Sequence, residues 1–317
     1  MSYELHKGNA FNLLEGYPEN RFHAVVTDPP YGVVEFETAN VEKMRDGEGG
    51  VWRIPPELDG NKRKPLPRFT VLSEDDKEKL RKFFRTFGES VERVLRPGGH
   101  IFVATTQLLM HEVSRQLDEA GLERRDVLVR EAKTLRGGDR PKGAHEEYSM
   151  VSSMPRVYWE PWLLYRKPLK GRLQDSLEEW ETGGLRRESE ARPFTDLLGN
   201  GKTPKEETEI VREAHPDDGD EARAHPNLKP QRLMRELCHA SLPLGEGTIL
   251  DPFIGSGSTV AAAEAVGYDA VGMEIDATFR EMAEEAVPRL AEVETEMEKR
   301  EDVGSPGEKE SSLSDFS

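Results

Sequence analysis

Two short segments of the chain place acidic side chains directly after apolar runs. Asp28-Pro-Pro-Tyr31-Gly32 follows the run at residues 24–27, and Asp251-Pro-Phe-Ile-Gly255-Ser-Gly257-Ser-Thr259 follows the run at residues 248–250. A proline pair removes backbone donors and stiffens a turn, so the first segment would hold an acid and an aromatic ring at the carboxyl end of a strand, where open α/β sheets bind ligands. Taken alone, Asp-Pro-Pro is explained equally well by a rigid turn that binds nothing.

The second segment has the composition of a nucleotide-binding turn. Its glycines allow a tight backbone turn and a close approach to a ligand, and the helix predicted after it offers free N–H groups. Glu274 closes the next strand, 17 residues after Gly257, where an acid can bind both ribose hydroxyls. The nicotinamide fingerprint needs a third small residue where this chain has Val260, so S-adenosylmethionine is favoured and a nicotinamide oxidoreductase stays an alternative.

The elements around these segments alternate between strands and helices, which predicts an α/β domain with a mostly parallel sheet. Strands are predicted at residues 24–27, 101–104, 127–129, 162–165, 248–250 and 270–273, and helices at 76–95, before Gly121, and at 229–242, 256–266 and from 278 onward. Residues 35–76 and 171–224 are rich in Gly, Pro and charge and are predicted as loops or insertions. Residues 292–317 read as a charged helix extension and a disordered tail.

The charge of the chain argues against nucleic acid as a partner. The 317 residues carry a formal net charge of -17, whereas nucleic-acid binders are usually basic. There is no apolar run of about 18 residues and no apolar signal core, which predicts a cytoplasmic protein without a membrane span. The lone Cys238 excludes an internal disulfide and a thiolate zinc site, and no metal site is expected.

The excess of acidic residues has two explanations that the sequence leaves open. The basic residues are 28 Arg and 16 Lys against 61 Asp and Glu. An acidic, Arg-rich and Cys-poor composition fits a salt-rich cytoplasm, where carboxylates keep a surface hydrated. It also fits an ordinary acidic protein with polar appendages.

Together the segments resemble the beta group of amino DNA methyltransferases, which modify adenine N6 or cytosine N4. Asp28-Pro-Pro-Tyr31 is similar to the catalytic motif of this family, and the segment from Asp251 to Thr259 is similar to its S-adenosylmethionine motif. His225-Pro-Asn-Leu-Lys-Pro230 matches the segment that precedes the cofactor motif, and Leu95-Arg-Pro-Gly-Gly-His-Ile-Phe-Val103 and Glu160-Pro-Trp-Leu-Leu-Tyr-Arg-Lys-Pro168 match later strands. The catalytic motif comes first, as in the beta group, and the matches span about residues 5–290.

The resemblance implies a Rossmann-like class I methyltransferase sheet with helices on both faces, a permuted motif order and an inserted target-recognition region. Residues 1–129 would form the catalytic half with an insertion at about 35–76, and residues 130–224 would recognise the target. Residues 225–290 would bind S-adenosyl-L-methionine, and residues 291–317 would be the helix end and tail.

The resemblance also implies a direct transfer to an exocyclic amine. The catalytic residues would be Asp28, Pro29, Pro30 and Tyr31: the Asp28 carboxylate and the Pro29 carbonyl accept the amine hydrogens, and Tyr31 stacks on a base flipped from the duplex. No covalent enzyme–base step is needed, so the presence of a single cysteine is no objection.

The implied cofactor residues come from five places in the chain. They are Asn9, Ala10, Asp28, Lys229, Asp251, Phe253, Gly255, Ser256, Gly257 and Glu274. Asn9 stands where the family has an acid near the adenine and can still form a hydrogen bond. Lys229 could contact the cofactor carboxylate or be a solvated residue at a helix start, and Phe253 could pack beside the cofactor or in the core.

Target recognition is expected from a basic run, although each cation alone could simply be solvated. The run is Arg124, Arg125, Arg130, Lys133, Arg136, Arg140 and Lys142, and a second cluster is Lys62, Arg63, Lys64 and Arg68. Tyr158, Trp159 and Trp162 could stack on bases or belong to the core. The net charge then predicts positive charge concentrated in one cleft of an otherwise acidic body.

The resulting hypothesis is an adenine N6 methyltransferase acting on double-stranded DNA, because an Asp in the first motif position is commoner in the adenine enzymes of the family. A restriction endonuclease is a further partner that the family suggests, and the protein would be a monomer or homodimer. Cytosine N4 methylation, methylation of RNA or protein, a nicotinamide oxidoreductase and a non-catalytic DNA-binding relic are the alternatives.

Overall fold

The structure is a computed structural model. It describes residues 2–30, 74–132, 147–148, 150–151, 155, 157–199, 203–215 and 228–295. Tyr31 and the predicted insertion up to residue 73 lie outside these ranges.

The strands form one sheet of eight in the order β1-β8-β7-β2-β3-β5-β4-β6. Their bounds are β1 Tyr3–Lys7, β2 Phe22–Thr27, β3 Leu95–Ala104, β4 Glu123–Glu131, β5 Trp159–Arg166, β6 Leu197–Leu198, β7 Thr248–Asp251 and β8 Asp269–Glu274. Every ladder is parallel except those of β5, which runs antiparallel between β3 and β4. The carboxyl ends of β8, β7, β2, β3 and β4 therefore all lie at one edge of the sheet, together with the start of β5.

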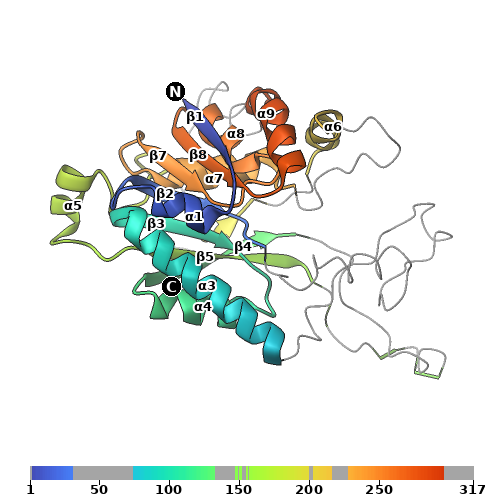
Figure 1. The fold of residues 1–317 in the computed structure, drawn as a ribbon, viewed down its shortest axis with the longest axis horizontal. Helices are drawn as coiled ribbons and strands as arrows, with labels where there is room; N and C mark the ends of the chain where they lie inside the picture. The colour runs from blue at the N-terminus through green and yellow to red at the C-terminus, as the bar shows by residue number, and fades with distance from the viewer. Residues whose placement is uncertain are drawn as a thin grey trace, which may run out of the picture.

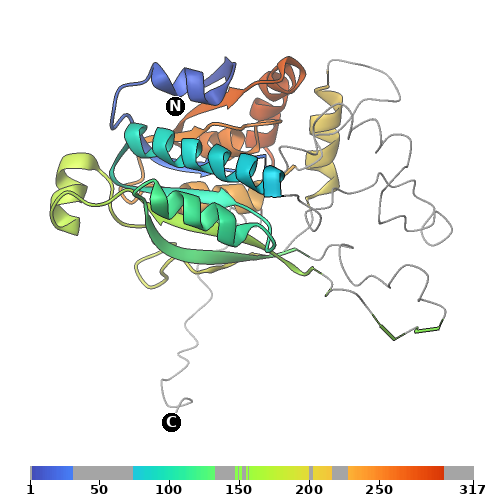
Figure 2. The ribbon, with the colours of Figure 1, turned by 60° about the horizontal axis from the view of Figure 1, so that its bottom comes forward.

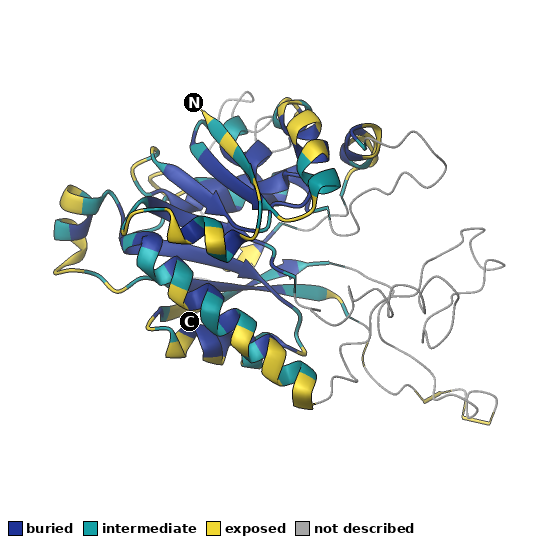
Figure 3. Ribbon diagram, viewed as in Figure 1, coloured by how far each residue is buried: buried dark blue, intermediate teal, exposed yellow. Residues whose placement is uncertain are grey.

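Helices cover both faces of this sheet (Figures 1 and 2). The helices are α1 Ala10–Glu15, α3 Glu74–Val94, α4 Met110–Glu119, α5 Leu173–Trp180, α6 Lys205–Glu213, α7 Gln231–Ser241, α8 Ser258–Ala265 and α9 Ala277–Ala291. One core holds side chains of α1, α3 and α4, and the other holds side chains of α6 to α9. The sheet strands are mostly buried while the outer faces of α3, α4 and α9 are exposed (Figure 3).

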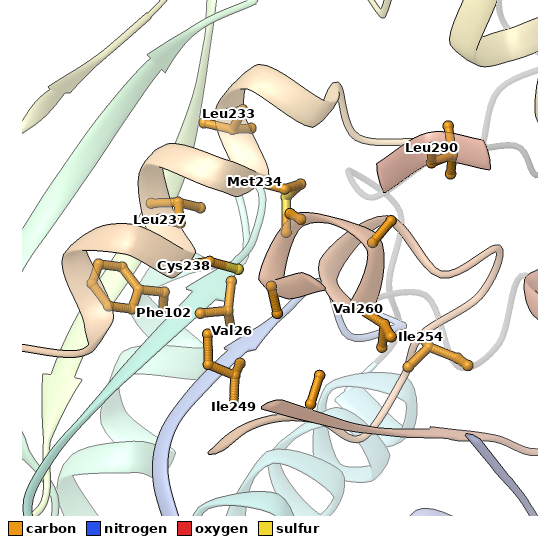
Figure 4. Packing of buried hydrophobic residues seen from close by; sticks show 14 of the residues in the cluster. Val26, Phe102, Leu233, Met234, Leu237, Cys238, Ile249, Ile254, Val260 and Leu290 are labelled. Atoms are coloured by element: carbon orange, nitrogen blue, oxygen red, sulfur yellow. The ribbon is translucent and has the colours of Figure 1, made fainter. Parts of the chain in front are cut away.

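The second core explains why the glycine segment is followed by an alanine-rich helix. Residues 258–263 of α8 are all buried because α8 lies between α7 and α9, and a helix that is apolar all round suits such a site. Met234 and Cys238 of α7 pack beside Val260 of α8 and above the strand residues Val26 and Ile249 (Figure 4). This packing fixes the start of α8 against the ends of β2 and β7.

The predicted fold class is confirmed: the sheet is mostly parallel and is covered on both faces. The predicted loops need correction at two places. Helix α3 already begins at Glu74, inside the predicted loop 35–76, and residues 171–224 include α5, β6 and α6. In the predicted target-recognition region 130–224, β5 lies inside the sheet between β3 and β4, and the recognition role of that region stays a prediction. Within the described ranges, no helix is long and apolar enough to cross a membrane.

Candidate active site

The two acidic segments meet at the carboxyl edge of the sheet, because β2 and β7 are neighbours in it. Residues of both segments line one pocket, joined by residues at the start of α7. The lining residues are Asp28, Lys229, Met234, Asp251, Phe253, Ile254, Ser256, Ser258 and Thr259. The structure thus brings Asp28 together with residues of the second segment, and the roles predicted for them stay predictions.

Asp251 joins the two segments from inside the protein. Its Oδ1 accepts a hydrogen bond from Thr27 Oγ1 at 2.6 Å and another from the backbone N–H of Phe253 at 3.0 Å. The residue is 3% exposed, and burial raises the pKa of its carboxyl to about 6 although hydrogen bonds from Thr259 and Thr27 act in the other direction. Asp251 therefore holds the end of β2 to the glycine turn.

The glycine turn is shaped by packing as well as by its backbone. Gly257 caps α8 in the left-handed region at φ 91°. A Cβ at this position would lie 2.5 Å from Val287 Cγ2 of α9, so a larger residue would push the two helices apart. Ser256, directly before it, is buried and lines the pocket.

Glu274 fixes the other side of this turn. Its Oε2 accepts the backbone N–H of Gly255 at 3.0 Å and its Oε1 accepts the backbone N–H of Asp276 at 2.9 Å. Burial raises the pKa of Glu274, although these backbone donors act in the other direction. The residue thus orders the turn from the end of β8, and its predicted contact with a ribose stays a prediction.

A chain of four alternating charges leads away from Asp28. Lys229 Nζ lies 3.1 Å from Asp28 Oδ2 and also donates to Glu160 Oε1. Arg130 Nη1 donates to the other oxygen of Glu160, Oε2, at 2.7 Å. Burial by itself raises the pKa of Glu160, but the ammonium of Lys229 and the guanidinium of Arg130 outweigh it and hold that pKa below its usual value.

Lys229 is therefore not a solvated residue at a helix start. Its side chain is 4% exposed, it precedes Pro230 at the N-cap of α7, and its ammonium lies 5.9 Å from the centroid of the Trp162 ring. Trp162 is fully buried. Trp162 was predicted either to stack on bases or to belong to the core, and in the structure it belongs to the core.

Three other predicted residues lie close to the site in structural positions. Asn9 is the N-cap of α1, and its Oδ1 accepts the backbone N–H of Phe11 at 2.9 Å. Ala10 is buried in the first turn of this helix. The ring of Phe253 packs against the rings of Phe83 and Phe87, with centroid distances of 5.6 and 5.9 Å. Phe253 also lines the pocket. Cofactor contacts by these three residues stay predictions.

The segment predicted to be catalytic lies within the described residues only as far as Pro30. Pro29 is buried and Pro30 is partly exposed. Tyr31 lies outside the described residues.

The three described residues of the basic run predicted to bind DNA do not lie together. Arg124 and Arg125 are exposed near the start of β4, which is the edge of the sheet opposite to Asp28. Arg130 lies at the site edge but is buried against Glu160. Lys133, Arg136, Arg140 and Lys142, and the cluster at residues 62–68, lie outside the described residues.

Sequence reasoning missed the contribution of Glu160. The sequence marks this residue only as the first of a strand-like segment. Its register partner in the antiparallel ladder is Arg130, and directly opposed residues have side chains on the same face of a sheet. The sequence does place Arg130 and Glu160, which have opposite charges, near the ends of two apolar runs. Only the pairing of the two strands shows that these residues are partners.

Two known proteins are similar in sequence to this chain over most of its length. A type II methyltransferase of Haemophilus influenzae, M.HindIII, is 25% identical over 273 residues, which cover 80% of this chain and 85% of that protein. The type II methyltransferase M.BglII of Bacillus subtilis is 21% identical over 88% of this chain and 67% of its own length.

Solved structures share the fold. The PvuII DNA methyltransferase, which is cytosine-N4-specific, superposes with a TM-score of 0.57 at 15% identity over 95% of this chain and 91% of its own. A protein described as a DNA modification methylase from Thermus thermophilus, in complex with S-adenosyl-L-methionine, gives a TM-score of 0.51 at 20% identity, covering 92% of this chain and 97% of that one. The sequence profile of the N6/N4 DNA methylases matches residues 22–285, and the chain belongs to this family of DNA methyltransferases.

Proposed function

We propose that this DNA methyltransferase modifies the N6 amine of adenine in double-stranded DNA at specific sites. The observation that carries the proposal is the position of Asp28 at the carboxyl end of β2, in one pocket with the glycine turn and Lys229. A carboxylate beside a nucleoside-binding turn is suited to accept hydrogens from an amine that lies next to a bound cofactor.

S-adenosyl-L-methionine is the cofactor. The site residues fit its chemical groups: Glu274, an acid at the end of β8, suits ribose hydroxyls, and the turn at Gly255 and Gly257 allows a close approach of the cofactor to the backbone. When bound, this cofactor supplies a methyl group on a positively charged sulfur. Phe253, Gly255, Ser256 and Gly257 complete the proposed binding surface.

The proposed work of Asp28 follows from the electronic structure of the target amine. The lone pair of an exocyclic amine is delocalised into the ring, which makes the nitrogen a poor nucleophile. The Asp28 carboxylate and the Pro29 carbonyl can accept hydrogen bonds from the two N–H groups of the amine. These hydrogen bonds favour a tetrahedral nitrogen with a free lone pair. The orientation imposed by these acceptors then supplies much of the rate acceleration.

The target base has to leave the duplex before it can reach Asp28, because its amine is otherwise paired. We assign stacking on the flipped base to Tyr31, by the similarity of its motif. Recognition of the DNA sequence is assigned to those parts of residues 130–224 that do not belong to the sheet, and to the basic residues within them.

The type II methyltransferases among the relatives support a role in restriction and modification, with an endonuclease as a partner. Sequencing of single DNA molecules from hosts with and without the gene would report the modified base and its site together.

The choice of adenine is tested by transfer of a tritiated methyl group from S-adenosyl-L-methionine to duplex DNA, followed by hydrolysis and separation of the nucleosides. We expect label in N6-methyl-2′-deoxyadenosine. Label in N4-methyl-2′-deoxycytidine would replace adenine by cytosine as the target, and label only in RNA or protein substrates would overturn DNA as the substrate. A calorimetric titration with S-adenosyl-L-methionine and with NAD checks the cofactor, since preferential binding of NAD would indicate an oxidoreductase.

A further inference from the structure

Glu160 occupies the centre of the charge chain that ends at Asp28. One of its carboxylate oxygens accepts from Lys229 Nζ and the other accepts from Arg130 Nη1 at 2.7 Å. The side chains of Glu160 and Arg130 are only 17% and 10% exposed. Their charges are therefore poorly screened by water and interact more strongly than a surface pair.

The charge chain is anchored in the sheet. Arg130 and Glu160 are directly opposed across the β4–β5 ladder. Lys229 instead precedes α7, and its ammonium is at the end of a long, flexible side chain. A lysine loses much rotamer freedom when it is fixed, so its position depends on what holds its ammonium. In this structure two carboxylates share it, one from β5 and one from the catalytic loop.

The four charges also balance. Asp28 and Glu160 contribute two negative charges, and Lys229 and Arg130 contribute two positive charges. Removal of the charge of Glu160 would leave two cations and one carboxylate in a poorly solvated region, and Lys229 would then have Asp28 as its closest anionic partner among these four groups. The carboxylate that has to accept the amine hydrogens would be drawn to the ammonium.

We propose that Glu160 is a positioning residue of the methyl transfer: anchored by Arg130, it holds the Lys229 ammonium so that Lys229 orients the Asp28 carboxylate toward the target amine. This inference rests on the proposed function of Asp28. It assigns to Glu160 an effect on the rate of the chemical step rather than on cofactor affinity.

The test compares Glu160→Gln with a matched control, Glu123→Gln. Glu123 forms the same kind of cross-strand pair at the other end of the same ladder, with Arg166 Nη2 at 2.6 Å. We expect Glu160→Gln to lower the single-turnover rate with saturating cofactor by about 10- to 100-fold, the scale of a displaced catalytic group. The Kd for S-adenosyl-L-methionine, from calorimetry, should change by less than about threefold, and Glu123→Gln should keep the wild-type rate.

A double-mutant cycle shows whether Glu160 acts through Lys229. If it does, the rate of Glu160→Gln combined with Lys229→Met equals that of Lys229→Met alone, whereas independent effects would multiply. A multiplied loss overturns the proposal. So does a wild-type rate for Glu160→Gln, or a raised Kd with an unchanged rate at saturating cofactor.

Two further arrangements keep the test decisive. If Glu160→Gln does not fold, as judged by its thermal unfolding, Arg130→Gln tests the chain from its other end, and a wild-type rate in that variant overturns the proposal. Absence of methyl transfer by the wild-type protein would contradict the proposed function itself. An active wild-type enzyme whose rate is unchanged by Glu160→Gln contradicts only this inference.

Discussion

The Asp28 carboxylate lies 3.1 Å from Lys229 Nζ, and we expect methyl transfer to depend on it. Replacement by Ala should lower methyl transfer by about 10³-fold or more, the contribution typical of a proton-accepting group. Cofactor binding should persist, because Glu274 and the glycine turn are untouched. Tritium transfer to DNA and calorimetry with S-adenosyl-L-methionine measure the two effects, and full activity of Asp28→Ala would remove the mechanism.

Glu274 should affect binding instead. Its replacement by Ala removes the acceptor of the Gly255 and Asp276 N–H groups together with the proposed ribose contact. Loss of hydrogen bonds to a charged group predicts a Kd for S-adenosyl-L-methionine raised by about 10-fold or more.

Asp276→Ala is the matched control for this variant. It removes the N-cap of α9, where Asp276 Oδ1 accepts the Thr278 N–H at 2.8 Å, and should cost about 1 kcal/mol of stability without changing the Kd. Equal affinity in wild type and Glu274→Ala would show that this carboxylate does not serve the cofactor.

A site residue can be predicted from the sequence when the residues that mark its role lie next to it in the chain. Asp28, Asp251 and the glycines lie in short segments whose residue types alone predict a ligand-binding site. Glu160 and Arg130 are distant in sequence and become partners only through strand register. For the same reason Arg130 was predicted as a DNA contact although it is buried in an ion pair.

At the scale of elements, the contact between α8 and α9 leaves no room for a larger residue at Gly257. Gly257→Ala combines a left-handed backbone with a Cβ placed 2.5 Å from Val287 Cγ2. We expect the free energy of unfolding to fall by about 2–5 kcal/mol, the sum of backbone strain and overpacking.

Gly121→Ala provides the control for this prediction. Gly121 has a similar φ, +89°, but nothing lies within 4 Å of its missing Cβ. Its replacement should cost only about 1–2 kcal/mol. Urea unfolding measures both variants, and equal losses would refute the steric explanation.

The periodic, apolar elements were predictable from sequence, since α3, α4, α7, α8 and the central strands follow their hydrophobic patterns. The short elements were not. α5 lies in a segment rich in Gly and charge, and its contacts are distant: Ser176 Oγ donates to the carbonyl of Pro97 at 3.2 Å. Such a helix is stabilised by tertiary contacts more than by its own sequence. The antiparallel direction of β5 is likewise a property of the assembled sheet.

At the scale of the whole molecule, the described residues do not gather positive charge in one cleft. Lys229 and Arg130, at the site edge, are each paired with carboxylates, and Arg124 and Arg125 lie at the opposite edge. The expected basic surface for DNA therefore stays a prediction that concerns residues 31–73 and 133–146.

The net charge of -17 also has a consequence for stability. Repulsion between like charges destabilises a compact state, and salt screens it. If the composition is an adaptation to salt, the melting temperature and solubility should both rise between about 0.1 M and about 2 M KCl. Thermal unfolding followed by circular dichroism at the two concentrations is the measurement, and an unchanged melting temperature contradicts the adaptation.

The strand order also bears on how the protein is made on the ribosome. β1 and β2 follow each other in the chain, yet β8 and β7 lie between them in the sheet. During synthesis the first two strands must therefore wait, with unpaired edges, until residues 248–274 have emerged. Exposed strand edges are prone to aggregation. A nascent chain that stops before Thr248 thus contains Asp28 but lacks the strands that complete the sheet around it.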